Sequence, residues 1–205
     1  MRKRWGIFLA VLFAALTQAS ARASTIVLNP VDDGSLYTCT TCDTTPSRMY
    51  LTVSGYIVGE VDFATAAFAG NVSSAYLSVN PYALPLFGPQ LDVYGFASAS
   101  STISISDLAS PTFLGTWTLP IGLGYGQDAF FDVSAFLTSV NSPYVDFILK
   151  DGSGGTDQFS STQNNYGHPA QLTVTLVPEP QTWTFLLLGL ALLGLTTRTW
   201  QKRTS

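Results

Sequence analysis

Between residues 24 and 177 the chain alternates short apolar runs with turn residues, a pattern typical of β-strands. The runs are rich in Val, Ile, Tyr and Phe, and Gly, Pro, Asn, Asp and Ser separate them. Residues 133–141 alone suggest a turn or two of helix. The predicted strands cover residues 24–29, 48–58, 60–63, 75–80, 90–96, 101–106, 113–119, 129–133, 144–150 and 170–176.

Strands that follow one another without intervening helices favour antiparallel sheets packed face to face. We therefore expect an all-β fold, an antiparallel β-sandwich of jelly-roll type, over residues 24–177. About 150 residues are enough to bury the core of one domain. The glycine-rich segment at residues 151–158 is expected to form a loop.

Two carboxylates alternate with two large apolar residues in one predicted strand. Glu60 and Asp62 fall on one face, and Val61 and Phe63 fall on the other. We expect the acidic face to lie in solvent, because the apolar face must turn to the core. The alternative is that Glu60 and Asp62 form a catalytic pair, since glycosidases use two carboxylates several ångströms apart.

The start of the chain has the three parts of a secretory signal peptide: cations, a 12-residue apolar run and small residues. An Ala-x-Ala pattern predicts cleavage between Ala23 and Ser24, with Ala19 and Ala21 as rival sites. The apolar run is too short for a membrane helix, which needs about 20 residues. Residues 1–23 are therefore expected to be removed on export.

A second apolar run, at residues 183–195, ends in the cations Arg198, Lys202 and Arg203. Its 13 residues span roughly 20 Å as a helix, a marginal crossing of a bilayer core about 30 Å thick. The cations predict a stop on the cytoplasmic side, with the domain outside. The alternative is a helix buried at the edge of the domain. Apolar residues cover all sides of the run, however, and a proline-rich hinge precedes it.

The tripeptide Pro178-Glu179-Pro180 stands directly before this run. The tripeptide, the short hydrophobic helix containing glycine, and the basic end together resemble a PEP-CTERM sorting signal, here at residues 178–205. The resemblance implies processing by an exosortase, a membrane transpeptidase-like protease of Gram-negative bacteria. The protein would be anchored for a time at the inner membrane and would then pass to the cell surface or its exopolysaccharide matrix.

The middle of the chain is similar in sequence pattern to DNRLRE-type secreted modules, which are jelly-roll, carbohydrate-binding-like domains. The DNRLRE string itself is absent. The resemblance implies a jelly-roll fold and, by analogy, a glycan-binding or structural role. The matching positions are Phe63, Ala75-Tyr76-Leu77, Asp132-Val133-Ser134, Phe147 and Leu172.

The charge of the domain excludes one class of partner. Between residues 24 and 177, two cations, Arg48 and Lys150, stand against twelve carboxylates, a net charge near −10. Such a domain would repel a nucleic acid. A neutral glycan, a divalent cation or another protein remains as a candidate partner.

Cys39 and Cys42 form a C-x-x-C pair, and they are the only cysteines of the chain. After export they meet an oxidising compartment, which favours a small structural disulfide. Free thiols, or a redox or metal function, are the alternatives. A structural zinc site needs four ligands, and the chain has no second cysteine pair. Redox-active pairs usually stand at the N-terminus of a helix, and Pro46 argues against a helix here.

No catalytic set emerges from the motifs, so no residue is assigned to catalysis or to a metal. His168 is the single histidine, and no G-x-S-x-G motif accompanies it. Two acidic segments are candidate calcium-binding sites, Asp32-Asp33 and Asp151 with Asp157, although plain surface charge is the simpler interpretation.

Sugar-binding sites commonly present an exposed aromatic side chain. Trp117 stands in a predicted strand and is equally suited to the core. Tyr82, Tyr125 and Tyr166 stand in predicted loops and are candidate platforms. We expect a non-enzymatic exported module with a structural or glycan-binding role and no cofactor. The alternative is a secreted polysaccharide-active enzyme that uses surface carboxylates.

Overall fold

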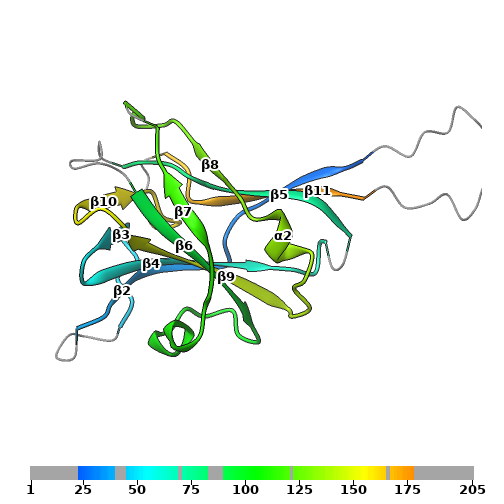
Figure 1. Cartoon of the computed structure of the whole chain (residues 1–205), viewed down its shortest axis with the longest axis horizontal. Coiled ribbons are helices and arrows are strands. Elements are labelled where there is room, and N and C mark those ends of the chain that lie inside the picture. Colours follow the sequence, from blue (N-terminus) through cyan, green and yellow to red (C-terminus); the bar gives the residue numbers. More distant parts are fainter. Residues whose placement is uncertain are drawn as a thin grey trace, which may run out of the picture. The chain divides into compact units, whose positions relative to one another are not determined.

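The computed structural model describes residues 23–39, 45–68, 71–82, 90–120, 122–164 and 167–177. Thr25–Leu176 forms one compact unit, and its strands build two antiparallel sheets (Figure 1). The predicted all-β sandwich is therefore confirmed. Among the residues described, none of the helices has the length and apolar character needed to cross a bilayer. The predicted signal peptide and the hydrophobic segment at residues 183–195 lie outside them.

The smaller sheet has the strand order β1-β11-β5-β8. Because β1 pairs with β11, the first and last strands of the unit lie side by side at one edge of this sheet (Figure 1, blue and orange). The strands are β1 (Thr25–Leu28), β11 (Gln171–Leu176), β5 (Val72–Val79) and β8 (Ala129–Asp132).

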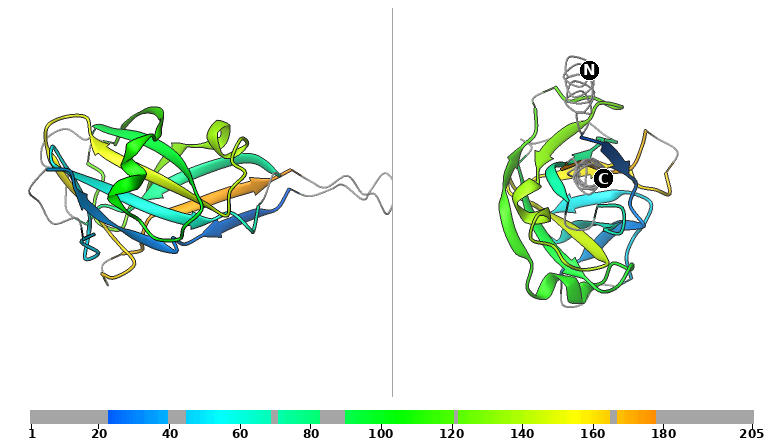
Figure 2. Two further views of the ribbon diagram at one scale, coloured as in Figure 1. Left: turned by 90° about the horizontal axis from the view of Figure 1, so that it is seen from below. Right: turned by 90° about the vertical axis from the view of Figure 1, so that its right-hand side faces the viewer.

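The larger sheet has seven strands, and Figure 2 shows it as a second layer beside the smaller one. Its order is β10-β3-β4-β9-β6-β7, and β2 pairs with β4. The strands are β2 (Asp32–Tyr37), β3 (Leu51–Ser54), β4 (Ile57–Ala64), β6 (Gln90–Ser98), β7 (Thr112–Thr118), β9 (Tyr144–Asp151) and β10 (Thr156–Phe159).

The core lies between the two sheets and is built by the alternation that the sequence displays. Each strand turns every second side chain inward, as Leu77 and Val79 do on β5 and Val61 and Phe63 do on β4. The ring of Phe63 meets that of Phe147 on β9 edge to face, with centroids 6.1 Å apart. Burial of these side chains supplies most of the free energy of folding.

A short helix, α2 (Ser134–Leu137), follows β8 and closes one end of the core. Leu137 is buried, and the ring of Phe136 packs edge to face on Phe147 at 6.0 Å between centroids. Phe136 also lies against Gly95 on β6, so closely that a Cβ atom there would be 2.4 Å from the ring. The predicted helical turn within residues 133–141 is thus confirmed.

A second, smaller apolar cluster lies on the outer face of the larger sheet. Leu36, Val58 and Ile148 form it, and Leu108 packs against them. Leu108 belongs to the 3₁₀ helix η1 (Ile105–Ala109) in the connection between β6 and β7. We call residues 99–111 of this connection the strap. The strap covers part of a sheet face that would otherwise meet water.

Two of the expected strand assignments were wrong. Residues 101–106 contain no strand and enter the strap, while residues 48–58 turn at 55–56 and divide between β3 and β4. Two strands were missed. Asp32–Tyr37 is short, polar and interrupted by Gly34, and Thr156–Phe159 is a short polar stretch directly after Gly155, so both lack the local pattern of a strand. Pairing with β4 and β3 makes them strands.

Candidate functional site

Three buried carboxylates lie together on the outer face of the larger sheet. Asp62 on β4 and Asp146 on β9 are partners in register, and Glu60 stands two residues from Asp62 on the same face. The exposed fractions of Glu60, Asp62 and Asp146 are 0%, 0% and 2%. Such burial is exceptional for unpaired acids.

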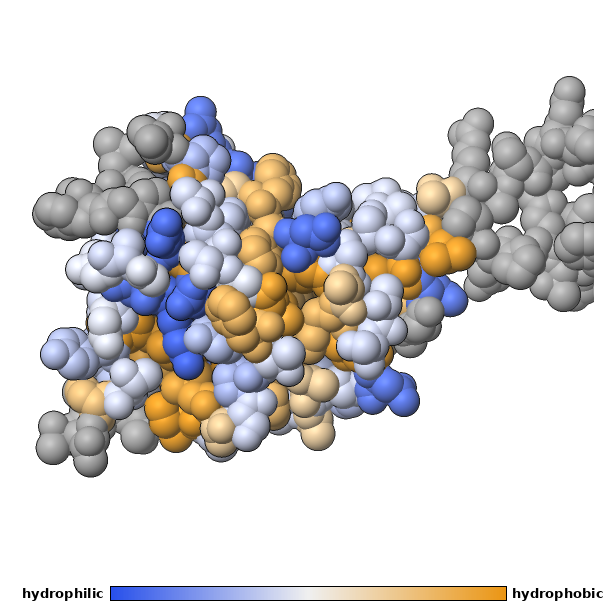
Figure 3. Space-filling view, viewed as in Figure 1, coloured by the Kyte–Doolittle hydropathy of each residue, from blue (hydrophilic) through white to orange (hydrophobic). Residues whose placement is uncertain are grey.

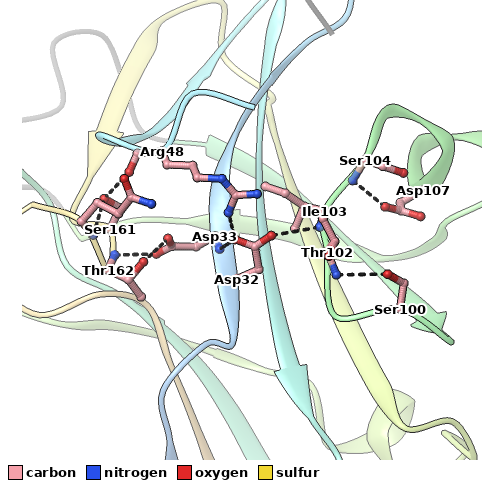
Figure 4. A network of polar contacts seen from close by, with 11 residues as sticks. Asp32, Asp33, Arg48, Ser100, Thr102, Ile103, Ser104, Asp107, Ser161 and Thr162 are labelled. Carbon is pink, nitrogen blue, oxygen red and sulfur yellow. Dashed lines mark hydrogen bonds and ion pairs between the residues drawn. The ribbon is translucent and has the colours of Figure 1, made fainter. Parts of the chain in front are cut away.

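The strap adds a fourth carboxylate. Asp107 stands in the first turn of η1, where its Oδ2 accepts a hydrogen bond of 2.7 Å from the backbone N–H of Ser104 (Figure 4). This bond fixes the Asp107 side chain as in a helix-capping box. One oxygen each of Glu60, Asp107 and Asp146 lies within 4.8 Å of the other two. A segment far from β4 in sequence therefore completes the cluster.

Most oxygens of the three buried carboxyl groups lack a hydrogen-bond donor. Both oxygens of Glu60, both of Asp62, and Oδ1 of Asp146 accept no hydrogen bond in the described part of the chain. Burial, followed by the charges of Asp107 and the other acids, raises the pKa of Glu60 to about 9. Burial and then the facing Asp62 raise the pKa of Asp146 to about 9, and burial raises that of Asp62 to about 6. Each carboxyl must bind a proton or a cation to avoid a buried negative charge.

A polar network around Asp32 links β2 to the strap (Figure 4). Asp32 on β2 is the register partner of Asp62. It pairs with Arg48, and its Oδ2 accepts a bond of 3.2 Å from the Ile103 N–H of the strap. Arg48 is thus engaged beside the cluster and does not neutralise it. Asp32 also ties the strap to β2.

The expectation that Glu60 and Asp62 lie in solvent is wrong. They do lie opposite Val61 and Phe63, as the alternation requires. The strap covers their face, however, so both carboxylates are buried. Sequence reasoning also missed Asp146 and Asp107. The sequence held a clue to Asp146. Residues 61–63 and 145–147 have the same sequence, Val-Asp-Phe, so the aspartate of each tripeptide faces away from the core when its apolar neighbours face inward.

The acidic segments proposed for calcium have other roles. Asp33 is buried and accepts two bonds from Thr162, 2.8 Å from its N–H and 2.6 Å from its hydroxyl (Figure 4). Asp151 caps the turn that follows β9 by accepting from the N–H groups of Ser153 and Gly154. Asp157 is buried on β10. In the described ranges, neither segment belongs to a group of three metal-ligating side chains.

His168 contacts Asp128 and a backbone carbonyl, and neither is a catalytic nucleophile. Its Nε2 lies 3.2 Å from Oδ1 of Asp128, and its Nδ1 lies 3.3 Å from the carbonyl oxygen of Pro169. Asn80 also donates to Asp128. Both ring nitrogens are therefore occupied, which leaves none to activate a serine.

The candidate aromatic platforms divide between core and surface. Trp117 is in the core, 6% exposed and 5.6 Å from the ring of Phe131. Tyr125 is exposed, Tyr82 stacks on Tyr50 with centroids 4.5 Å apart, and Tyr166 lies outside the described residues. Figure 3 shows hydrophobic residues at the surface among hydrophilic ones on the face that it draws.

Sequence reasoning overlooked a more regular aromatic surface, the outer face of the smaller sheet. Tyr76 on β5 and Phe130 on β8 are 42% and 58% exposed, and Val27 on β1 is 56% exposed. All three face away from the core because their strand neighbours, such as Leu77, face inward. We call this surface the outer aromatic face.

Several predicted site residues cannot be placed. Cys42, and with it the disulfide to Cys39, lies outside the described residues, as do the tripeptide at 178–180 and the cations Arg198, Lys202 and Arg203. Ala23 and Ser24 are exposed and precede β1. Cleavage between them and the disulfide stay predictions.

Comparison with known families matches residues 176–203 to the PEP-CTERM protein-sorting motif. No curated protein matches the chain. The motif confirms the sorting signal predicted from Pro178, Glu179 and Pro180, and it implies export, a transient membrane anchor and an exosortase as processing partner. The resemblance of the middle to DNRLRE-type modules stays a prediction. The chain therefore carries, at residues 176–203, the PEP-CTERM sorting motif of exported proteins that an exosortase processes.

Proposed function

We propose that the domain is a non-enzymatic module of the cell surface or extracellular matrix and that it binds a neutral glycan through the outer aromatic face. The observation that carries the proposal is the exposure of Tyr76 and Phe130 on one face of an antiparallel sheet. Aromatic faces attract the C–H groups of a sugar ring, and exposed aromatics are otherwise a cost to a soluble protein.

The two aromatic side chains are neighbours. Tyr76 pairs with Asp132, and Ser78 pairs with Phe130, across β5 and β8. Tyr76 and Phe130 therefore stand in a diagonal relation on one face, within reach of a common ligand. One ring of an extended saccharide can rest on each of them.

Polar side chains surround the aromatics. Thr173 lies between Val27 and Tyr76 in register, and Gln171 lies beside Ser78. The amide of Gln171 is held by a hydrogen bond of 3.0 Å to Asn29 Oδ1. Hydroxyl and amide groups next to an apolar platform suit sugar hydroxyls, which both donate and accept hydrogen bonds.

Charge favours a neutral ligand. The domain carries twelve carboxylates and two cations between residues 24 and 177. Lys150 is on the other sheet, with its ammonium group 4.4 Å from the ring centroid of Tyr94. An anionic polysaccharide would meet repulsion without a local cation to offset it.

The alternative of a polysaccharide-active enzyme rests on Glu60 and Asp62. Their burial argues against it, because a polymer must touch the catalytic acid and base. If the protein turned over an envelope glycan and Glu60→Gln abolished this activity, the enzyme interpretation would be favoured.

Affinity electrophoresis in gels containing the exopolysaccharide of the producing cells tests the proposal. We expect the wild-type chain to be retarded and the double variant Tyr76→Ala, Phe130→Ala to bind roughly tenfold more weakly. Phe113→Ala is the matched control, since Phe113 is 55% exposed on the other sheet. Equal retardation of the double variant and the wild type would refute the proposal, and so would no retardation of the wild type by neutral glycans.

A further inference from the structure

The buried acids on the larger sheet lack a counter-charge within the protein. The described part of the chain contains two basic side chains with a permanent charge, Arg48 and Lys150. Arg48 pairs with Asp32, and Lys150 lies over the ring of Tyr94. Neither therefore neutralises the acids around Glu60.

We infer that Glu60, Asp107 and Asp146 bind a calcium ion, with Asp62 as an adjoining carboxylate, and that the ion fastens the strap to strands β4 and β9. The cluster alone would not carry this inference. The second observation is Glu60 itself, which is fully buried, directs a carboxylate oxygen into the cluster, and has no hydrogen-bond partner on either oxygen among the described residues.

The distances suit one ion. Calcium binds oxygens at about 2.3–2.6 Å, so two oxygens on the same ion can be at most about 5 Å apart. The ligand oxygens of Glu60, Asp107 and Asp146 lie within 4.8 Å of one another. A single ion can therefore reach all three with small side-chain movements and without a change of strand register.

The chemistry of the donors selects the class of metal. The cluster consists of carboxylates, which are hard ligands, whereas zinc and copper favour imidazole and thiolate. The single histidine is engaged with Asp128. Calcium accepts six to eight oxygens in flexible geometry and binds carboxylates through one or both oxygens. Magnesium requires near-ideal octahedral geometry and retains several waters, which suits a closed cluster less well.

The competing explanation is that the acids are simply protonated. Burial raises the pKa of Glu60 and of Asp146 to about 9, so the cation-free protein can hold protons there. Apolar residues would fill the same positions at lower cost, as Leu36, Val58 and Ile148 do beside them. Several acids that converge from two strands and the strap are better explained by a ligand that needs them charged.

The position of Asp107 gives the ion a structural role. The strap is otherwise attached by Ile103 and Leu108 and by the bond from the Ile103 N–H to Asp32. An ion shared by Asp107, Glu60 and Asp146 would link the strap to the sheet directly. Asp107 is only half-buried, so the ion has a route from solvent at this residue.

Calorimetric titration of the chelator-treated full-length chain in detergent with calcium chloride tests this inference. We expect one calcium per chain, with a Kd between about 10⁻⁶ and 10⁻³ M, and a rise in Tm when calcium is added. Magnesium at the same concentration should raise Tm less. Glu60→Gln and Asp107→Asn should each weaken calcium binding roughly tenfold or more, because each removes a charged ligand.

Asp92→Asn is the matched control. Asp92 is a half-buried acid on β6 of the same sheet, and asparagine can still accept the bond of 2.7 Å from Thr116. This control should bind calcium like the wild type.

If a variant does not fold, comparison of the wild-type Tm in calcium, magnesium and potassium still tests whether the site prefers calcium. No calcium-dependent rise in Tm, an equal rise with magnesium, or unchanged binding in folded Glu60→Gln and Asp107→Asn would overturn the inference. Glycan binding is measured separately, so its failure would leave this result unaffected.

Discussion

Asp62 and Asp146 face each other in register across β4 and β9, each at the centre of a Val-Asp-Phe tripeptide. Because the strands are antiparallel, Val61 faces Phe147, and the apolar residues of both tripeptides enter the core. The two acids are left together on the opposite face under the strap. The same local pattern that builds the core thus gathers carboxyl groups where water cannot solvate their charged form.

The stability of the cation-free protein should fall as pH rises. Burial raises the pKa values of Glu60 and Asp146 to about 9, whereas both acids titrate near pH 4 when unfolded. Between these values the folded state binds more protons than the unfolded state, so the free energy of unfolding decreases with pH. Each group can contribute at most about 1.4 kcal/mol per pH unit.

Thermal unfolding at pH 5, 6, 7 and 8 with a chelator present measures this effect. Tm should decline across the series. Glu60→Gln removes one of the titrating groups, and its decline should be shallower. A constant or rising Tm in the wild type would contradict the assigned directions of the pKa shifts.

Gly95→Ala should destabilise the domain by about 1–3 kcal/mol. The new Cβ would stand 2.4 Å from the Phe136 ring, which is fixed against Phe147, so the helix α2 must shift. Urea unfolding measures the loss. Gly55→Ala is the control, because no atom beyond its two chain neighbours lies within 4 Å of the Cβ position, and it should change stability by less than about 0.5 kcal/mol. Equal effects of the two substitutions would argue against the contact.

Thr162→Val should cost about 1–3 kcal/mol, because it removes the hydroxyl that donates at 2.6 Å to buried Asp33. Thr116→Val removes a similar bond of 2.7 Å to Asp92, but in an exposed position. Solvent can replace that bond, so its loss should cost less than about 0.5 kcal/mol. Chemical unfolding of both variants compares the two bonds, and a larger loss in Thr116→Val would contradict the role of Asp33.

Replacement of Pro178, Glu179 and Pro180 by alanine should block processing of the tail. The matched motif contains this tripeptide, so we expect the hydrophobic segment behind it to remain attached. Intact-mass measurement of the protein in membrane and surface fractions reads the result. We expect the variant to retain residues 181–205 in the membrane fraction. A C-terminus and location identical to those of the wild type would show that the tripeptide is not used.

Much of the fold follows from local pattern. The core strands alternate with a period of two, so their inward residues could be named from the sequence, as Phe63 and Phe147 show. The strands β2 and β10 could not, since their polar sequences become strands only by pairing with β4 and β3. Strand propensity depends on neighbours that lie far away along the chain.

The sequence by itself determined the layered all-β architecture, the excess of negative charge and the sorting motif, because each depends on residues adjacent in the chain. Only the tertiary structure decided that Glu60, Asp62 and Asp146 are buried and that Asp107 joins them. Alternation states which face a side chain takes, whereas its contact with water depends on what covers that face. Here the cover is a strap that arrives from a different part of the chain.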